Sequence, residues 1–245
     1  MTYEQALEFI HSRIHLGTRK GLFRMEGLME KLGNPEKRMK FVHIAGSNGK
    51  GSTATMCESV LRRAGYKTGL FLSPFVFDFR ERMQVNGQLV DKQLMADVLE
   101  SMLPALEAMK AEDKECTEFE TVTALALMLF ERCGKAVINV DDSYAPRFLE
   151  AASCPVLTTA VTGAGDLRAE NVELLSDGIR YDAVAEGEKV PVHVPIPGRF
   201  TVYNTLTVLG IARQLGISLA DAAAALKTVE GVKGRIEVVP TPGTP

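Results

Sequence analysis

A glycine-rich turn between an apolar run and a helical run is the most constraining feature of this chain. Residues 41–45 (FVHIA) are apolar apart from His43, and they lead directly into residues 46–53 (GSNGKGST). A helical pattern follows over residues 54–64. The backbone N–H groups of such a turn, together with the N-terminus of the next helix, form a site for phosphate groups. The segment therefore predicts a strand, a phosphate-binding loop and a helix in succession.

The residue types in this loop suit a nucleoside triphosphate with its metal ion. Lys50 would supply positive charge at the β- and γ-phosphates, and the hydroxyl of Ser52 or Thr53 would be a ligand for Mg²⁺. The common phosphate-loop pattern has a glycine where this chain has Ile44, so a glycine-rich turn with a solvated lysine is the alternative interpretation. The combination of residues nevertheless favours ATP binding by Gly46, Ser47, Asn48, Gly49, Lys50, Gly51, Ser52 and Thr53.

Composition limits the class of protein. The chain has 245 residues, is 46% hydrophobic and carries a net charge of −3 without long blocks of like charge, which argues against a nucleic-acid-binding surface. There is no signal-like N-terminus and no apolar run of membrane-spanning length, so we expect a cytoplasmic protein without a membrane or nucleic-acid partner. Four scattered cysteines without CxxC spacing are expected to be reduced thiols in or near a core: Cys57, Cys116, Cys133 and Cys154.

Alternating helical and strand-like patterns predict an α/β fold, a mostly parallel sheet flanked by helices with ligands at the carboxyl ends of its strands. Helices are expected at residues 3–14, 22–32, 52–64, 91–110, 118–132, 145–152, 202–215 and 219–229, and strands at 41–45, 67–72, 136–140 and 156–159. Asp91 is a suitable N-cap. Residues 73–90 are expected to form a loop closed by an Asn86-Gly87 turn, and residues 166–194 an antiparallel ribbon.

Three blocks in the first ninety residues resemble the folylpolyglutamate synthases, which in many bacteria are also dihydrofolate synthases. The loop at 45–53 (AGSNGKGST) is similar to the ATP loop of that family. Residues 10–25 resemble its N-terminal segment, and residues 71–87 resemble its mobile loop after the second strand. The order of the three blocks makes the resemblance specific.

From about Lys135 onward the likeness changes to the UDP-N-acetylmuramoyl-peptide ligases, which belong with the folate enzymes to the Mur ligase superfamily. The similar stretches are residues 136–142 (AVINVDD), 197–204 (PGRFTVYN) and 231–235 (GVKGR). The resemblance implies an ATP-binding domain over residues 1–239, with a folate-synthase-like half at 1–134 and a Mur-ligase-like half at 135–239. Residues 240–245 would be a truncated linker.

The resemblance implies an ATP-dependent ligase. In this superfamily ATP phosphorylates a carboxylate, and the amine of an amino acid such as glutamate then displaces the phosphate. The substrate would be an acidic small molecule, either folate- or pteroate-like or a UDP-muramoyl peptide, and the cofactors would be ATP and Mg²⁺. Such chemistry requires charge neutralisation and in-line positioning more than covalent help from the protein.

The resemblance also assigns site residues. Glu120 matches the Mg²⁺-binding glutamate at the start of a helix, with Glu118 as the alternative; without the resemblance Glu120 would be an ordinary first-turn glutamate. Ser73 resembles a residue that approaches the metal, although a turn hydroxyl is an equally good interpretation. Asn204 and Arg235 correspond to positions that contact the nucleotide. The implied catalytic residues are Lys50 and Glu120, and the implied metal ligands are Ser52, Ser73 and Glu120.

A basic loop lies upstream of the phosphate-binding segment. Arg19 and Lys20, together with Arg24, could meet an acidic substrate. Because charged runs are usually solvated, a solvent-exposed face is the favoured interpretation.

Two parts of the family pattern have no counterpart here. Family members carry, before the strand at 136–140, a segment with a metal-binding histidine and a carbamylated lysine, and they end in a domain that binds the incoming amino acid. The folate enzymes also usually have histidine where this chain has Phe75. We expect the strand at 136–140 to occupy the vacated position in the sheet, beside the phosphate-loop strand.

Two hypotheses follow from these gaps. One is an ATP-dependent ligase that works with a separate glutamate-ligase domain, and the other is a non-catalytic or incomplete Mg-ATP-binding module. A generic P-loop ATPase is disfavoured, because Asp141 and Asp142 end a strand but belong to the Mur-like stretch.

Overall fold

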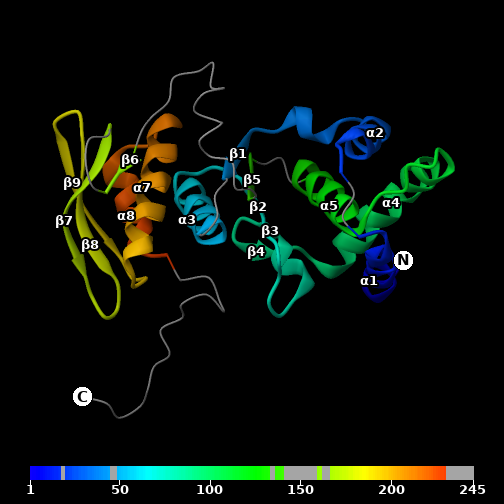
Figure 1. The fold of residues 1–245 in the computed structure, drawn as a ribbon, viewed down its shortest axis with the longest axis horizontal. Coiled ribbons are helices and arrows are strands. Elements are labelled where there is room, and N and C mark those ends of the chain that lie inside the picture. The colour runs from blue at the N-terminus through cyan, green and yellow to red at the C-terminus, as the bar shows by residue number, and fades with distance from the viewer. Residues whose placement is uncertain (18–19, 45–48, 133–135, 141–158, 162–165, 230–245) are drawn as a thin grey trace, which may run out of the picture. The chain divides into compact units, whose positions relative to one another are not determined.

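A computed structural model describes residues 1–17, 20–44, 49–132, 136–140, 159–161 and 166–229 (Figure 1). The chain divides into two compact units. The first comprises Met1–Val42, Lys67–Phe71 and Asp78–Val137, and the second comprises His43–Tyr66, Leu72–Phe77 and Ile138–Pro245. No described helix is long and apolar enough to cross a membrane.

Helices form most of the first unit. Its described α-helices are α1 (Tyr3–His11), α2 (Phe23–Lys31), α4 (Lys92–Ala111) and α5 (Glu118–Arg132), with 3₁₀ turns η1 (Ile14–Leu16), η2 (Pro35–Arg38) and η3 (Phe79–Arg82). Helices α1 and α2 both pack on α4 and α5, which also pack on each other. Helix α4 buries Met95, Leu99, Met102, Leu106 and Met109 along one face, at the spacing of an amphipathic helix.

Most helix boundaries agree with the sequence prediction. Asp91 caps α4 by accepting a hydrogen bond from the backbone N–H of Leu94 at 2.9 Å, as expected. Helix α5 spans the predicted residues 118–132. The first helix is shorter than predicted: it ends at His11, and the chain continues into η1 before a left-handed Gly17.

A five-stranded sheet has the order β1-β5-β2-β3-β4. Its strands are β1 (Phe41–Ile44), β5 (Ala136–Val140), β2 (Thr68–Phe71), β3 (Met83–Val85) and β4 (Gln88–Leu89). Strand β5 lies between β1 and β2. The prediction that residues 136–140 take a position beside the phosphate-loop strand is therefore confirmed.

Residues 73–90 are not a simple loop, and that prediction is corrected. The Asp78 carboxylate accepts from the backbone N–H of Arg80 at 2.9 Å and starts η3. Strands β3 and β4 then form a hairpin that pairs antiparallel with β2. Asn86 and Gly87, with φ of 51° and 72°, supply the left-handed backbone that a tight hairpin turn requires. The predicted Asn86-Gly87 turn is correct, but it joins two strands.

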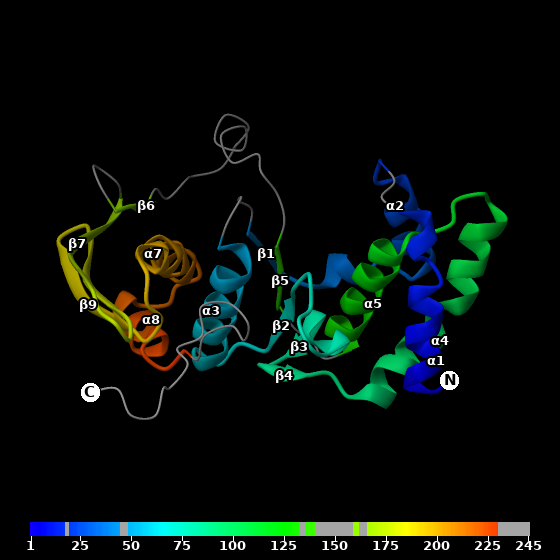
Figure 2. The ribbon, with the colours of Figure 1, turned by 60° about the horizontal axis from the view of Figure 1, so that its bottom comes forward.

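The second unit contains a four-stranded sheet covered by helices. The sheet has the order β6 (Thr159–Ala160), β7 (Leu167–Leu174), β8 (Ile179–Ala185) and β9 (Glu188–Val194). The predicted antiparallel ribbon corresponds to β7–β9 and is confirmed. Helix α7 (Arg199–Gln214) lies between this sheet and α3 (Lys50–Arg63), and α8 (Leu219–Leu226) contacts β9 (Figure 2).

Alternation along β8 explains how the ribbon holds α7. Ile179, Tyr181, Ala183 and Ala185 are buried on the face that covers the helix. The Tyr181 hydroxyl donates to Thr205 Oγ1 of α7 at 2.9 Å, and burial raises the pKa of this phenol. The buried tyrosine hydroxyl therefore has a hydrogen-bond partner, as buried tyrosines usually do.

Some predictions fall outside the described residues. They are the helix at 145–152, most of the strand at 156–159, the linker at 240–245, and Cys133 and Cys154. The other two cysteines are free and buried, as expected. Burial raises the pKa of the Cys57 thiol to about 12 and that of Cys116 to about 11, so both are poor nucleophiles.

The contact between β2 and α5 yields a stability prediction. A Cβ at Gly69 would lie 2.6 Å from Cγ of the buried Phe130. We expect Gly69→Ala to lower the free energy of unfolding by about 1–3 kcal/mol, because the ring has to shift. In the matched control Gly27→Ala, the new Cβ meets only the flexible end of Met109 at 3.2 Å, and the change should stay within about 1 kcal/mol. Urea unfolding of both variants measures the difference, and equal costs would contradict this packing.

Candidate functional site

Helix α3 begins at Lys50, directly after a glycine with left-handed backbone. Gly49 has φ 77° and ψ −3°, a conformation that glycine adopts without strain. The backbone N–H of Thr53 donates to the carbonyl of Gly49 at 2.9 Å, which closes the first turn. By helix geometry the first N–H groups of α3 are directed out of its N-terminal end. The N-terminal end of a helix can hold an anion, and phosphate binding at this end of α3 stays a prediction.

The predicted loop residues are only partly described. Gly46, Ser47, Asn48 and Arg235 lie outside the described residues. Gly49, Lys50, Gly51, Ser52 and Thr53 are described and occupy the cap and first turn of α3. Gly51 and Thr53 are buried, whereas Lys50 and Ser52 are half-buried.

Asn204 of α7 lies against Gly49. A Cβ at position 49 would be 2.5 Å from Oδ1 and 2.8 Å from Nδ2 of Asn204, so only glycine leaves room for this side chain. Nδ2 is buried and has no hydrogen-bond partner among the described residues. A buried amide donor without an acceptor costs about 1–3 kcal/mol, which an acceptor atom of a ligand would recover. The structure thus brings together two predicted nucleotide-binding residues that are distant in the sequence.

Glu120 in the first unit is held by two contacts. Its Oε2 accepts from the backbone N–H of Thr117 at 2.8 Å, and Thr117 Oγ1 accepts from the N–H of Glu120 at 3.2 Å. This is a capping box at the start of α5. The ordinary first-turn interpretation of Glu120 therefore describes a real structural function of this carboxylate.

Arg24 makes the second contact with Glu120. Its Nε donates to Oε1 and Oε2 at 3.0 and 3.2 Å, and its Nη2 lies 3.0 Å from Oε1. The two side chains are only 4% and 13% exposed. The prediction that Arg24 belongs to a solvated basic face is wrong, because this guanidinium is buried in an ion pair. Lys20 is exposed as expected, and Arg19 is outside the described residues.

The alternative metal ligand also faces an arginine. Glu118 Oε1 lies 3.8 Å from Arg82 Nη1. No group of three or more metal-binding side chains occurs among the described residues. Mg²⁺ commonly keeps several waters and binds through one or two carboxylates together with phosphate oxygens. Ser52 offers one hydroxyl in the first turn of α3, and its role as a metal ligand stays a prediction.

Ser73 follows β2 by two residues and is half-buried. Its approach to a metal ion stays a prediction. Glu120 belongs to the first unit, whereas the N-terminus of α3 belongs to the second. No local pattern in the sequence connects residue 24 with residue 120, and the ion pair between them was therefore missed.

Sequence comparison finds relatives of two kinds. The Mur ligase middle domain family matches residues 115–212. The dihydrofolate synthase/folylpolyglutamate synthase of Bacillus subtilis is 33% identical over 209 residues, which cover 84% of this chain and 48% of the relative. A UDP-N-acetylmuramoyl-L-alanyl-D-glutamate–2,6-diaminopimelate ligase of Clostridium botulinum is 29% identical over 236 residues, covering 84% and 49%. The chain spans about half the length of these relatives.

Solved structures show the same fold. The folylpolyglutamate synthase of Thermotoga maritima superimposes with a TM-score of 0.81 at 22% identity, over 97% of this chain and 68% of that chain. A complex of a folylpolyglutamate synthase with AMPPCP and folate superimposes with a TM-score of 0.74 at 20% identity, over 92% and 71%. The predicted α/β fold is confirmed by these neighbours.

The contact between Gly49 and Asn204 can be tested by a double-mutant cycle. We expect Gly49→Ala to lower the free energy of unfolding by about 3 kcal/mol, from backbone strain and the clash together. In an Asn204→Ala background the clash is gone, and the cost should fall to the strain alone, about 1–2 kcal/mol. Equal costs in both backgrounds would show that the two residues are not in contact.

The structural function of Glu120 gives a second prediction. We expect Glu120→Ala to lower the free energy of unfolding by about 3 kcal/mol, because the buried Arg24 loses its carboxylate partner and the backbone N–H of Thr117 loses its cap. Glu112→Ala removes partly exposed ion pairs with Lys31 and Lys114 in the same unit and should cost much less. Thermal unfolding without ligands or Mg²⁺ compares the two, and similar costs would contradict the assignment.

Proposed function

Because this chain is a homologue of the folylpolyglutamate synthases and of the Mur ligases, we propose that it binds Mg-ATP at the N-terminus of α3. The nucleotide would activate the carboxylate of an acidic small molecule for coupling to an amino acid. The observation that carries the proposal is the buried Asn204 Nδ2, which has no hydrogen-bond partner among the described residues and lies against Gly49 at the cap of α3. This arrangement leaves a hydrogen-bond donor beside an anion site.

Each described residue has a separate task in this proposal. Lys50 neutralises negative charge on the phosphates, and the first N–H groups of α3 orient them. Asn204 donates its free N–H to the nucleotide. When bound, Mg-ATP supplies the phosphoryl group that makes the carboxylate reactive toward an amine. Gly46, Ser47, Asn48 and Arg235 are proposed to complete the nucleotide site.

The proposed metal ligands are Ser52, Ser73 and Glu120. Ser52 and Ser73 offer hydroxyl oxygens, and Glu120 offers the carboxylate that a hard cation prefers. Arg24 opposes a cation at Glu120, because like charges repel at short range. Glu120 would therefore bind Mg²⁺ only if Arg24 shares or releases its carboxylate.

The proposed substrate is a folate- or pteroate-like acid, with glutamate as the incoming amino acid. This choice rests on relatives named as folylpolyglutamate synthases in both the sequence and the structural comparisons. A UDP-muramoyl peptide is the second candidate, supported by the Clostridium botulinum relative. A separate glutamate-ligase domain is proposed as a partner, from the likeness to these ligases. We propose a cytoplasmic location, without nucleic-acid or membrane partners.

Nucleotide binding is tested by thermal shift. Mg-ATP at about 100 times its dissociation constant should stabilise the protein by about 2.7 kcal/mol. Lys50→Ala should lose this stabilisation, whereas Lys67→Ala, which removes an exposed lysine ahead of β2, should retain it. If Lys50→Ala is stabilised as much as the unaltered chain, ATP does not use the α3 site.

Ligase activity needs a second experiment. The chain is incubated with Mg-ATP, glutamate and either dihydropteroate or a UDP-muramoyl peptide, and ADP and the coupled product are followed by mass spectrometry. ADP release that depends on one acid identifies the carboxylate that is activated. Mg-ATP binding without ADP release in the presence of either acid would favour the non-catalytic module.

A further inference from the structure

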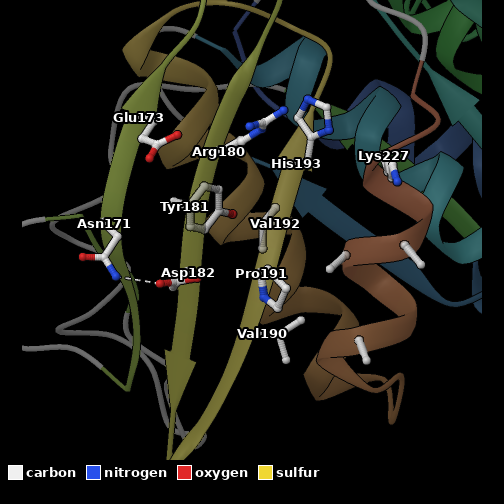
Figure 3. Close-up of a pocket in the computed structure, with 13 residues that line it drawn as sticks. Asn171, Glu173, Arg180, Tyr181, Asp182, Val190, Pro191, Val192, His193 and Lys227 are labelled. Carbon is white, nitrogen blue, oxygen red and sulfur yellow. Dashed lines mark hydrogen bonds between the residues drawn. The ribbon is translucent and has the colours of Figure 1, made fainter.

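A groove of about 720 Å³ lies on the second unit, formed by β7, β8, β9 and α8 (Figure 3). None of the predicted nucleotide- or metal-binding residues lines it. Three basic side chains from three elements reach it: Arg180 from β8, His193 from β9 and Lys227 at the C-terminal end of α8. The groove is therefore a second place in this chain where an anion can be held.

Strand register places two of these basic residues side by side. Arg180 and His193 are direct partners across β8 and β9, so they occupy the same face of the sheet. Glu173 is the partner of Arg180 on the other side, in β7. Figure 3 shows the Arg180 guanidinium directed toward the His193 ring rather than toward Glu173. Lys227 lines the same groove from the C-terminal end of α8.

The other basic residues of the same sheet form ion pairs with carboxylates. Arg168 lies 3.4 Å from Glu170, and Lys189 lies 2.9 Å from Asp182. Within the part of the chain that the structure describes, no carboxylate pairs with Arg180, His193 or Lys227 at ion-pair distance. The ribbon therefore pairs its other basic side chains with carboxylates, whereas the three basic side chains of the groove have no carboxylate partner among the described residues.

The acidic side chains of the groove do little to cancel this charge. Asp182 is already held by Lys189 and accepts a hydrogen bond from Asn171 Nδ2 at 2.7 Å. Glu173 stands at the far edge, in β7. The end of the groove between Arg180 and Lys227 is thus positive, and a guanidinium there can bind a phosphate or carboxylate through two N–H donors.

The remaining wall is apolar and shallow. Ala220, Ala223 and Ala224 repeat along one side of α8 and end at Lys227, and Val190 and Pro191 of β9 lie opposite. Pro191 lacks a backbone N–H, which makes the edge strand β9 a poor template for an added peptide strand. A compact molecule fits these walls better than an extended peptide.

We propose that this groove binds a small organic anion that carries phosphate or carboxylate groups. Its charged groups contact Arg180, His193 and Lys227, and its apolar part lies on the alanines of α8 and on Pro191. The site is independent of the nucleotide site at the N-terminus of α3. Its occupancy can therefore be measured without any ligase activity.

The test uses full-length Lys50→Ala protein, so that the α3 site contributes little, with two probes: inorganic pyrophosphate and tricarballylate, a tricarboxylate. Binding is followed by calorimetry and by the NMR signal of His193, which the His193→Gln variant assigns among the four histidines. We expect saturable binding of at least one probe, with a change in the His193 signal. Pyrophosphate alone would indicate a phosphorylated ligand, and tricarballylate alone a polycarboxylate.

Variants decide whether the groove is responsible. Arg180→Gln and Lys227→Gln should each weaken binding about tenfold, the loss expected for one charge-assisted contact. Arg168→Gln removes the same charge from the same sheet outside the groove and should leave the affinity within about twofold. Lack of saturable binding at about 10 mM probe, or equal weakening by Arg168→Gln, would overturn the proposal.

Discussion

The left-handed backbone of Gly49 is the constraint on which the candidate site depends. It lets α3 begin at Lys50, and the first N–H groups of the helix are directed out of its N-terminal end. It also leaves the space that Asn204 fills. Any side chain at position 49 would both strain the turn and displace the amide. A single missing Cβ thus lets the N-terminal end of α3 pack against Asn204 of α7.

A second constraint governs the start of α5. Glu120 satisfies the backbone of Thr117 and neutralises the buried Arg24 at the same time. Both contacts stabilise the first unit whether or not a metal is bound. If Glu120 binds a metal ion as proposed, the cation would compete with the Arg24 guanidinium for the same carboxylate.

Much of the fold follows from local signals in the sequence. Asp91 predicted the start of α4, and the turns of residues 166–194 predicted the ribbon, because caps and turns depend on neighbouring residues alone. The hairpin of β3 and β4 was missed because its strands are too short to show a period, although its Asn86-Gly87 turn was visible. The contacts Gly49–Asn204 and Arg24–Glu120 join distant segments, and no periodicity encodes such pairs.

The central claim is that Asn204 and the N-terminus of α3 hold ATP together. The most direct measurement is calorimetric titration of Mg-ATP into the unaltered chain, Asn204→Ala and Asn204→Asp. The aspartate keeps the shape but replaces the N–H donor with a charged acceptor, so its affinity should fall at least about tenfold, and further than that of the alanine variant. Equal affinity in all three proteins would contradict the claim, because the amide beside Gly49 would then have no part in binding.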